Sequence, residues 1–256
     1  MRLLLVKLLL TPVLMFVVSW AARRWGPGIG GLLAGLPLTS GPISIYLCAE
    51  QGSSFAASAA ANSILSLTPV ALFSVVYGRL SDTRRVPTCA ICGLGVFLLS
   101  LYCLQKSGFS FLAAWITGLL AISVGLMLTP NKIPTRFQIR YPQWDLPARI
   151  ISATAMVLTI TLFASFLGSQ WSGLLSPIPV LAWPLCLFVH HQQGGDGARA
   201  VLRGILEGAY GVLIFYTIVA AGLAILPPIL VYAVAIVASV AVSLPWLKGK
   251  LVLPAE

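Results

Sequence analysis

The sequence contains few charged residues, and acidic residues are especially scarce. Only 9% of its 256 residues are charged, and Asp and Glu together number 6. Soluble globular domains carry about 25% charged residues, because their surfaces face water. The scarcity therefore excludes a soluble globular enzyme, a disordered chain and a fibrous protein.

Long apolar runs take the place of the missing charges. Hydrophobic residues make up 59% of the chain, and a helix needs about 20 such residues to cross a hydrocarbon core of about 30 Å. The sequence predicts an all-α polytopic integral membrane helix bundle of about nine transmembrane helices. Strands of a membrane barrel are excluded, because they are shorter and alternate between apolar and polar residues. The predicted spans are Leu3 to Ala21, Gly28 to Ala49, Phe55 to Tyr77, Thr88 to Gln105, Phe109 to Leu128, Arg149 to Gly168, Trp171 to Val189, Ala198 to Gly222 and Leu226 to Leu247.

Positive residues are distributed unevenly among the connecting loops, and the chain carries a net charge of +10. Since short cytoplasmic loops are enriched in Lys and Arg, the excess indicates a topology signal rather than a nucleic-acid partner. On the side of the membrane opposite the basic loops, only Arg2 and Lys106 lie clearly near the surface. Nine spans put the two termini on opposite sides, so the sequence predicts the N-terminus outside and the C-terminus in the cytoplasm. The basic loops hold Arg23, Arg24, Arg79, Arg84, Arg85, Lys132, Arg136, Arg140, Arg199, Lys248 and Lys250.

A displacement of 142 residues aligns the chain with itself, laying Gly31 to Pro37 over Gly173 to Pro179 without a gap. Between residues 31 and 52, seven of 22 positions are identical: Gly31, Leu32, Leu33, Pro37, Pro42, Gln51 and Gly52. General similarity between membrane spans explains matched leucines, but not matched prolines and a matched Gln-Gly pair. We therefore expect an internal repeat.

The same displacement leaves the fifth span unmatched between two four-helix units. An odd helix between the units means that the second unit enters the membrane from the opposite side. The sequence thus predicts two inverted four-helix repeats, over residues 1–105 and 141–256, joined by a linking helix and a basic cytoplasmic loop over 106–140. Inverted repeats are typical of secondary transporters, although channels and proteins without transport activity also contain them.

Prolines interrupt the second and seventh predicted spans. Each removes a backbone donor, and the freed carbonyls need partners within the protein. Broken helices at matching positions of two halves indicate a substrate site, while simple proline kinks are the alternative. The predicted substrate-binding residues are Pro37, Thr39, Ser40, Gly41, Pro42, Asn62, Pro177, Pro179 and Pro184.

Asn62 also has a packing interpretation. The repeat aligns Asn62 and Ser66 with Gly204 and Gly208. Small residues let membrane helices approach closely. We therefore expect spans three and eight to pack together, with Asn62 hydrogen-bonded in the interior.

Glu50 and Glu207 are the acidic residues within or at the edge of a span, where an ionisable group is costly in lipid. Arg203 lies one helical turn before Glu207 and can pair with it. These three residues are the candidates for proton or ion coupling, and coupling predicts that Glu207→Gln abolishes uptake. The alternative is structural, with an Arg203–Glu207 packing pair and Glu50 as an interfacial cap.

No cofactor and no metal site are expected. Cys89 and Cys92 lie in an apolar span without a second pair, and His190 and His191 with Asp196 form only a weak metal pattern. A membrane-embedded transferase needs acidic or histidine residues gathered at one interface. The candidates for such a cluster, Asp82, Asp145, Asp196 and His190, belong to separate loops.

The segment Gly30 to Ser40, continuing at Glu50 to Gly52, resembles the GlpM-type small bacterial membrane proteins. Those proteins are single four-helix units, and this chain is similar to two such units fused through an extra helix. The second copy departs from the pattern at Pro177, Trp183 and His190. The resemblance implies a bacterial inner (cytoplasmic) membrane and no particular substrate.

These observations favour a small permease or flippase that binds its substrate between the two broken helices. The alternative is an accessory membrane subunit without transport activity, belonging to an envelope or lipid-processing complex. The expected partners are the lipid bilayer and a small-molecule or lipid-linked substrate. Whether the protein forms a homo-oligomer stays open.

Overall fold

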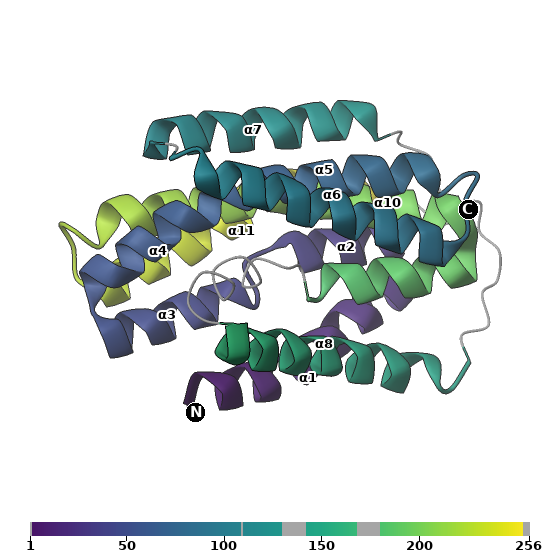
Figure 1. Ribbon diagram of the computed structural model, residues 1–256, viewed down its shortest axis with the longest axis horizontal. Coiled ribbons are helices and arrows are strands. Elements are labelled where there is room, and N and C mark those ends of the chain that lie inside the picture. Colours follow the sequence, from purple (N-terminus) through teal and green to yellow (C-terminus); the bar gives the residue numbers. More distant parts are fainter. Residues whose placement is uncertain (1, 109, 130–141, 168–179, 253–256) are drawn as a thin grey trace.

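The computed structural model describes residues 2–108, 110–129, 142–167 and 180–252, which form helices and connections without a strand (Figure 1). The all-helical prediction is confirmed for this part of the chain. The helices are α1 (Arg2–Trp25), α2 (Pro27–Gly35), α3 (Ser40–Gln51), α4 (Ser53–Leu65), α5 (Leu67–Leu80), α6 (Val86–Lys106), α7 (Phe111–Leu128), α8 (Asp145–Leu167), α10 (Ala182–Gly222) and α11 (Pro228–Val252).

Seven helical segments within the described ranges are long and apolar enough to cross a membrane. The difference from the nine predicted spans has two sources. The 41 residues of α10 cover parts of two predicted spans and count once, although its backbone bends at Gly194. The segment matching α8 is not among the seven. The chain is therefore a helical membrane bundle.

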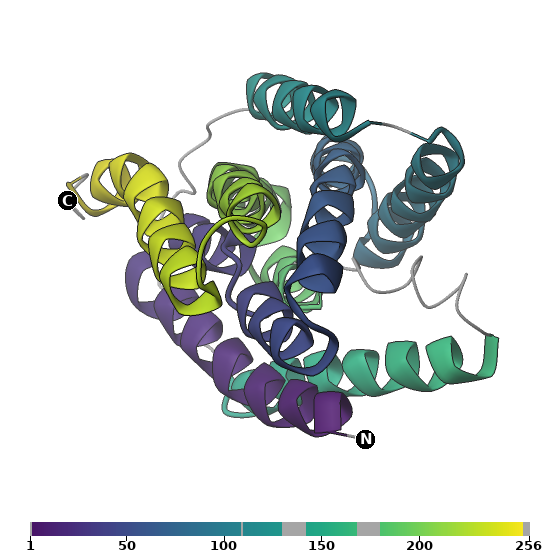
Figure 2. The same ribbon diagram turned by 90° about the vertical axis from the view of Figure 1, so that its left-hand side faces the viewer.

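The central helix of this bundle is α10, and Figure 2 shows the other helices grouped around it. It contacts α2, α11, α4, α5 and α7, and many of its side chains are buried. Its sequence explains this position, because apolar and small residues cover most of its surface rather than one face. Elements on every side of the bundle are thus held against one helix.

The contact between α2 and α10 brings two backbones together. A Cβ atom added to Gly31 would lie 2.1 Å from the carbonyl oxygen of Val201, and one added to Gly208 would lie 2.4 Å from that of Leu32. Only glycine permits such an approach. The glycines recur at every fourth position of both helices, as Gly31 and Gly35 on α2 and as Gly204 and Gly208 on α10.

This contact corrects part of the packing prediction. The expected contact between spans three and eight exists, since α4 packs against α10. Gly204 and Gly208 of α10 face α2, however, rather than Asn62 and Ser66 of the third span. The physical reason is that glycines on both helices allow a closer approach than one glycine face against polar side chains.

Helix boundaries recur at a displacement of 142 residues. The displacement separates the starts of α3 and α10, the ends of α5 and α10, and the starts of α6 and α11. The residues before α3 and α10 have nearly the same backbone angles, with φ −91° and ψ −43° at Thr39 and φ −92° and ψ −43° at Leu181. The displacement found in the sequence therefore also relates local backbone geometry.

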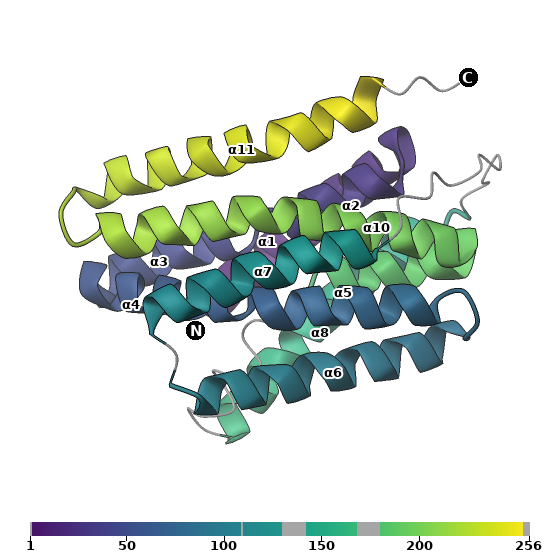
Figure 3. The ribbon, with the colours of Figure 1, turned by 90° about the horizontal axis from the view of Figure 1, so that it is seen from above.

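Two glycine bends share the same displacement. Gly52 joins α3 to α4 with φ 87° and ψ 167°, and Gly194 bends α10 with φ 70° and ψ −166°. Gly52 precedes α4, whereas the residue after Gly194 lies against Ser81 at the end of α5. Because α4 and α5 run on through the bundle, the α3–α4 connection, which contains Gly52, and the α5–α6 turn, against which Gly195 lies, are at opposite ends of it (Figure 3).

Basic residues of the described loops gather at the end that contains Gly194, while Lys132, Arg136 and Arg140 lie outside the described residues. An ion pair joins Arg23 at the end of α1 to Asp145 at the start of α8, and Lys250 near the end of α11 approaches Gly28 of α2. We call this the basic end, defined by Arg23, residues 81–85, Asp145, Gly194 and Lys250. The end with Gly52 and the connection between α10 and α11 is called the far end.

Candidate functional site

The second predicted span is broken rather than kinked. Helix α2 ends at Gly35, helix α3 begins at Ser40, and Leu36 between them has an extended backbone with φ −75° and ψ 161°. The Leu36 amide donates to the Leu33 carbonyl at 3.1 Å, and the Gly41 amide donates to the Pro37 carbonyl at 2.8 Å. The predicted interruption is present at Pro37 and Thr39, whereas Ser40 is the first residue of α3.

The break lies against the second half of α10. A Cβ atom on Gly41 would be 3.6 Å from the Phe215 ring, and the hydroxyl of buried Tyr216 lies near the side chains of Ser40 and Ser63. One turn further along α3, the Ser44 and Tyr232 hydroxyl oxygens are 2.9 Å apart. Polar groups from α3, α4, α10 and α11 therefore surround the interruption.

The structure places the other predicted substrate residues differently. Pro42 and Pro184 are each the third residue of their helix, and Pro184 is buried. Pro177 and Pro179 lie outside the described residues. Among the described residues of this group, Pro37 to Pro42 lie at the break between α2 and α3, and Pro184 lies near the start of α10.

Asn62 is exposed on α4, so the expected hydrogen bond in the interior is wrong. The buried face of α4 consists of Ala56, Ala60 and Ile64, spaced four residues apart. Asn62 lies two residues from Ala60 and Ile64 and therefore points away from that face.

Glu207 forms a cluster with two cations. Its carboxylate lies 3.3 Å from Arg203 Nε and 2.7 Å from Lys250 Nζ, and only 4% of its side chain is exposed. Arg203 also donates to the carbonyls of Leu126 and Thr129 at 3.1 and 2.8 Å. The predicted Arg203–Glu207 pair is confirmed, and it belongs to a cluster that joins α7, α10 and α11.

Glu50 is far from this cluster. It is exposed at the end of α3, near the far end, and accepts a hydrogen bond from the Tyr46 hydroxyl one turn earlier. Glu207, in contrast, pairs with Lys250 of the basic end. The two acidic candidates therefore cannot form one coupling site.

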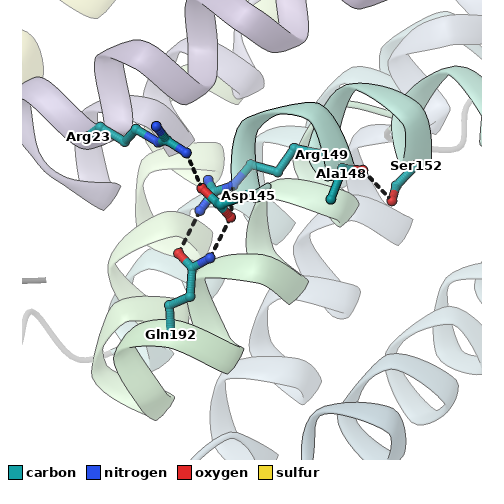
Figure 4. A network of polar contacts seen from close by, with 6 residues as sticks. All are labelled: Arg23, Asp145, Ala148, Arg149, Ser152 and Gln192. Atoms are coloured by element: carbon teal, nitrogen blue, oxygen red, sulfur yellow. Dashed lines mark hydrogen bonds and ion pairs between the residues drawn. The ribbon is translucent and has the colours of Figure 1, made fainter. Parts of the chain in front are cut away.

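The most deeply buried ion network is centred on Asp145 (Figure 4). Arg23 Nη2 lies 2.5 Å and Arg149 Nε 2.9 Å from its carboxylate oxygens. The Gln192 amide donates to Asp145 and accepts from Arg149 Nη2 at 2.9 Å. Burial alone raises the pKa of the Asp145 carboxyl, but the two guanidinium groups and the amide hold that pKa below its ordinary value.

The Asp145 network was missing from the predicted site. The sequence predicts a loop at Asp145, but this residue is the first of α8 and has no exposed side-chain surface. The signal in the sequence was the spacing of Asp145 and Arg149, which places them on one helix face. Gln192 and Arg23 could not be linked to them by local spacing.

A pocket of about 430 Å³ opens at the basic end. It lies where the turn between α5 and α6 meets the bend in α10. His190 on its wall is buried, and its Nδ1 is 3.0 Å from the Tyr77 hydroxyl. The residues lining the pocket include Arg84, Arg85, Pro87, His190, His191 and Gly194.

Asp82 and Asp196 meet beside this pocket, each in an ion pair with the buried Arg199. Their convergence near His190 is the arrangement that a membrane-embedded transferase requires. Both carboxylates are engaged by the same guanidinium group, however, which fits a structural link between the α5–α6 turn and α10 better than acid–base catalysis. Within the described residues, no group of three or more His, Cys, Asp or Glu side chains could hold a metal ion.

No protein-family profile, curated protein or solved structure matches this chain. The resemblance to the GlpM-type proteins therefore stays a prediction. The broken helix, the buried ion clusters and the basic pocket are the features of the structure from which a function can be inferred.

Proposed function

We propose that this chain is a small membrane transporter, a permease or flippase, built from two inverted four-helix repeats joined by α7. The 142-residue recurrence of helix boundaries and the placement of the Gly52 and Gly194 bends at opposite ends support this architecture. In this arrangement α8 crosses the membrane and α10 supplies parts of two crossings, giving nine. The basic end faces the cytoplasm of a bacterial inner membrane, with the N-terminus outside.

The observation that carries the transport proposal is the break between α2 and α3. Residues 36–39 interrupt the helix inside the bundle, where Ser40, Ser63 and Tyr216 provide hydroxyl groups. An interrupted helix offers backbone groups and helix ends to a substrate without exposing them to lipid. The substrate would therefore pass between this break and the second half of α10.

The second half of the site follows from the repeat. Pro184 is the third residue of α10, as Pro42 is the third residue of α3. Pro177 and Pro179 are assigned to this half by their sequence positions alone. Rocking of one repeat against the other would then expose the site to each side in turn.

Glu207 is the stronger of the two candidates for proton or ion coupling. Its side chain is buried, and it pairs with both Arg203 on its own helix and Lys250 on α11. Protonation of Glu207 would remove both ion pairs and release the end of α11 from α10. Glu50 is exposed and engages only Tyr46 among the contacts described.

The test uses single cysteines in a protein whose five native cysteines are replaced by alanine. Gln51 and His191 are both exposed. A membrane-impermeant thiol reagent should label Gln51→Cys in intact cells and His191→Cys in inverted vesicles. Reaction from the same side would contradict the inverted architecture.

Thr39→Cys and Ser40→Cys test the transport path without a known substrate. A position that lines an alternating-access path should react with the impermeant reagent from both sides. Leu120→Cys is the control, because Leu120 is 56% exposed near the middle of α7 and should face lipid. It should react only with a membrane-permeant maleimide. If neither Thr39→Cys nor Ser40→Cys reacts with the impermeant reagent, whichever side it is added from, the accessory-subunit alternative is favoured.

A further inference from the structure

The basic pocket has a composition suited to an anion. Arg84, Arg85 and His191 are exposed residues of its lining, and among the described residues no acidic side chain is part of that lining. The nearest carboxylates along the chain, Asp82 and Asp196, are both paired with Arg199. Each of these carboxylates therefore has a cationic partner, Arg199, that is not part of the pocket lining.

Backbone groups add to this positive character. Helix α6, 21 residues long, begins at the pocket, and its N-cap residue Arg85 provides no side-chain cap for the first turn. Amide groups at a helix N-terminus attract anions through their unpaired N–H groups and the helix dipole. Pro87 lacks an N–H, so the amides of Val86 and Thr88 are those available in the first turn.

The opposite wall is formed by the bend in α10. Gly194 has φ 70°, and a Cβ atom on Gly195 would lie 2.5 Å from the Ser81 carbonyl oxygen. No side chain fits between α10 and the α5–α6 turn at that point. Backbone therefore forms this wall, while the Tyr77 contact fixes the His190 ring beside it.

We propose that this pocket binds a phosphate group, carried either by an anionic lipid headgroup or by a free phosphate compound. Arginine guanidinium groups match phosphate oxygens in geometry and charge. The volume of about 430 Å³ accommodates a phosphate together with a small attached group. The assignment does not depend on transport, because the pocket lies at the basic end, away from the break between α2 and α3.

The test compares two double variants of the full chain, purified in detergent and in nanodiscs. Arg84→Gln with Arg85→Gln removes the pocket cations. Arg24→Gln with Arg79→Gln is matched in charge, because both arginines are exposed near the same end and neither lines the pocket. Binding of inorganic phosphate is measured in detergent by calorimetry, and retention of phosphatidylglycerol against phosphatidylcholine is measured by native mass spectrometry.

The pocket variant should bind its probe roughly tenfold or more weakly than the wild type, because two charge-assisted contacts are lost, whereas the control should stay within about twofold. A loss confined to inorganic phosphate identifies a free phosphate compound, and a loss confined to phosphatidylglycerol identifies a lipid headgroup. Equal losses in both variants would mean that only diffuse surface charge attracts the anion, which would overturn the proposal. Absence of binding by the folded wild-type protein to either probe would overturn it as well.

Discussion

The two glycine bends have the same backbone but different surroundings. Gly52 and Gly194 adopt matching φ and ψ angles at positions 142 residues apart. Around Gly52 the polar side chains are exposed, as at Glu50. Just before Gly194, Gln192 joins the buried network of Asp145 and Arg149. The backbone pattern is thus shared, whereas the polar chemistry is concentrated at the basic end.

This difference can be followed to single positions in the sequence. The residues that match Asp145, Arg149 and Gln192 in the first half are Leu3, Lys7 and Glu50. Arg149 and its counterpart Lys7 are both cations. The position of Asp145, in contrast, holds a carboxylate only in the second half, because its counterpart is Leu3. Apolar patterning and glycine therefore suffice to reproduce the bend, while a buried ion network depends on one acidic residue.

The largest expected effect comes from removing that residue. Asp145→Ala leaves Arg149 buried without its carboxylate partner, and breaking a buried pair costs about 3–5 kcal/mol of the free energy of unfolding. Glu50→Ala removes an exposed acid at the matching bend and should cost less than about 1 kcal/mol. Chemical unfolding of the purified proteins, followed by tryptophan fluorescence, measures both changes. Equal losses would contradict the distinction between the two ends.

An intermediate effect tests the shared backbone. Both glycines lie in a region of φ and ψ that is nearly restricted to glycine, so Gly52→Ala and Gly194→Ala should each cost about 1–3 kcal/mol. No atom lies within 4 Å of a Cβ at either position, so strain alone acts and the two losses should be similar.

Gly95→Ala serves as the control for the glycine substitutions. Gly95 lies inside α6 with a normal helical backbone and open space around its Cβ position. Alanine there should be neutral or stabilising by about 1 kcal/mol, since it favours the helix. Strongly unequal losses at Gly52 and Gly194 would mean that the two bends are not equivalent in energy.

Features that depend on local sequence were predictable. Long apolar runs specified helices, and proline with its neighbours specified the break between α2 and α3. The spacing of Arg203 and Glu207 specified their ion pair. Each of these signals acts within one or two helical turns, where sequence spacing fixes the spatial relation.

Features that depend on helix packing were not predictable. Lys250 reaches Glu207 from another helix, and Gln192 reaches Asp145 in the same way. Asn62 illustrates a second difficulty, because α4 has small apolar residues on several faces, so its sequence does not distinguish the buried face from the exposed one. Which face of such a helix is buried is decided by its neighbours rather than by its own pattern.

The smallest expected effect is the pH dependence of the Asp145 network. Because the pKa of Asp145 in the folded protein lies below its ordinary value of 3.8, its carboxylate stabilises the fold above that value, and this contribution is lost as the pH falls through the lower folded-state pKa. The difference in free energy of unfolding between wild type and Asp145→Asn should therefore be constant at neutral pH and shrink below pH 3.8. The difference between wild type and Gly52→Ala should stay constant over the same range, because it involves no titrating side chain. If the difference in free energy of unfolding between wild type and Asp145→Asn does not change with pH, the network acts through hydrogen bonding and packing rather than through the charge of Asp145.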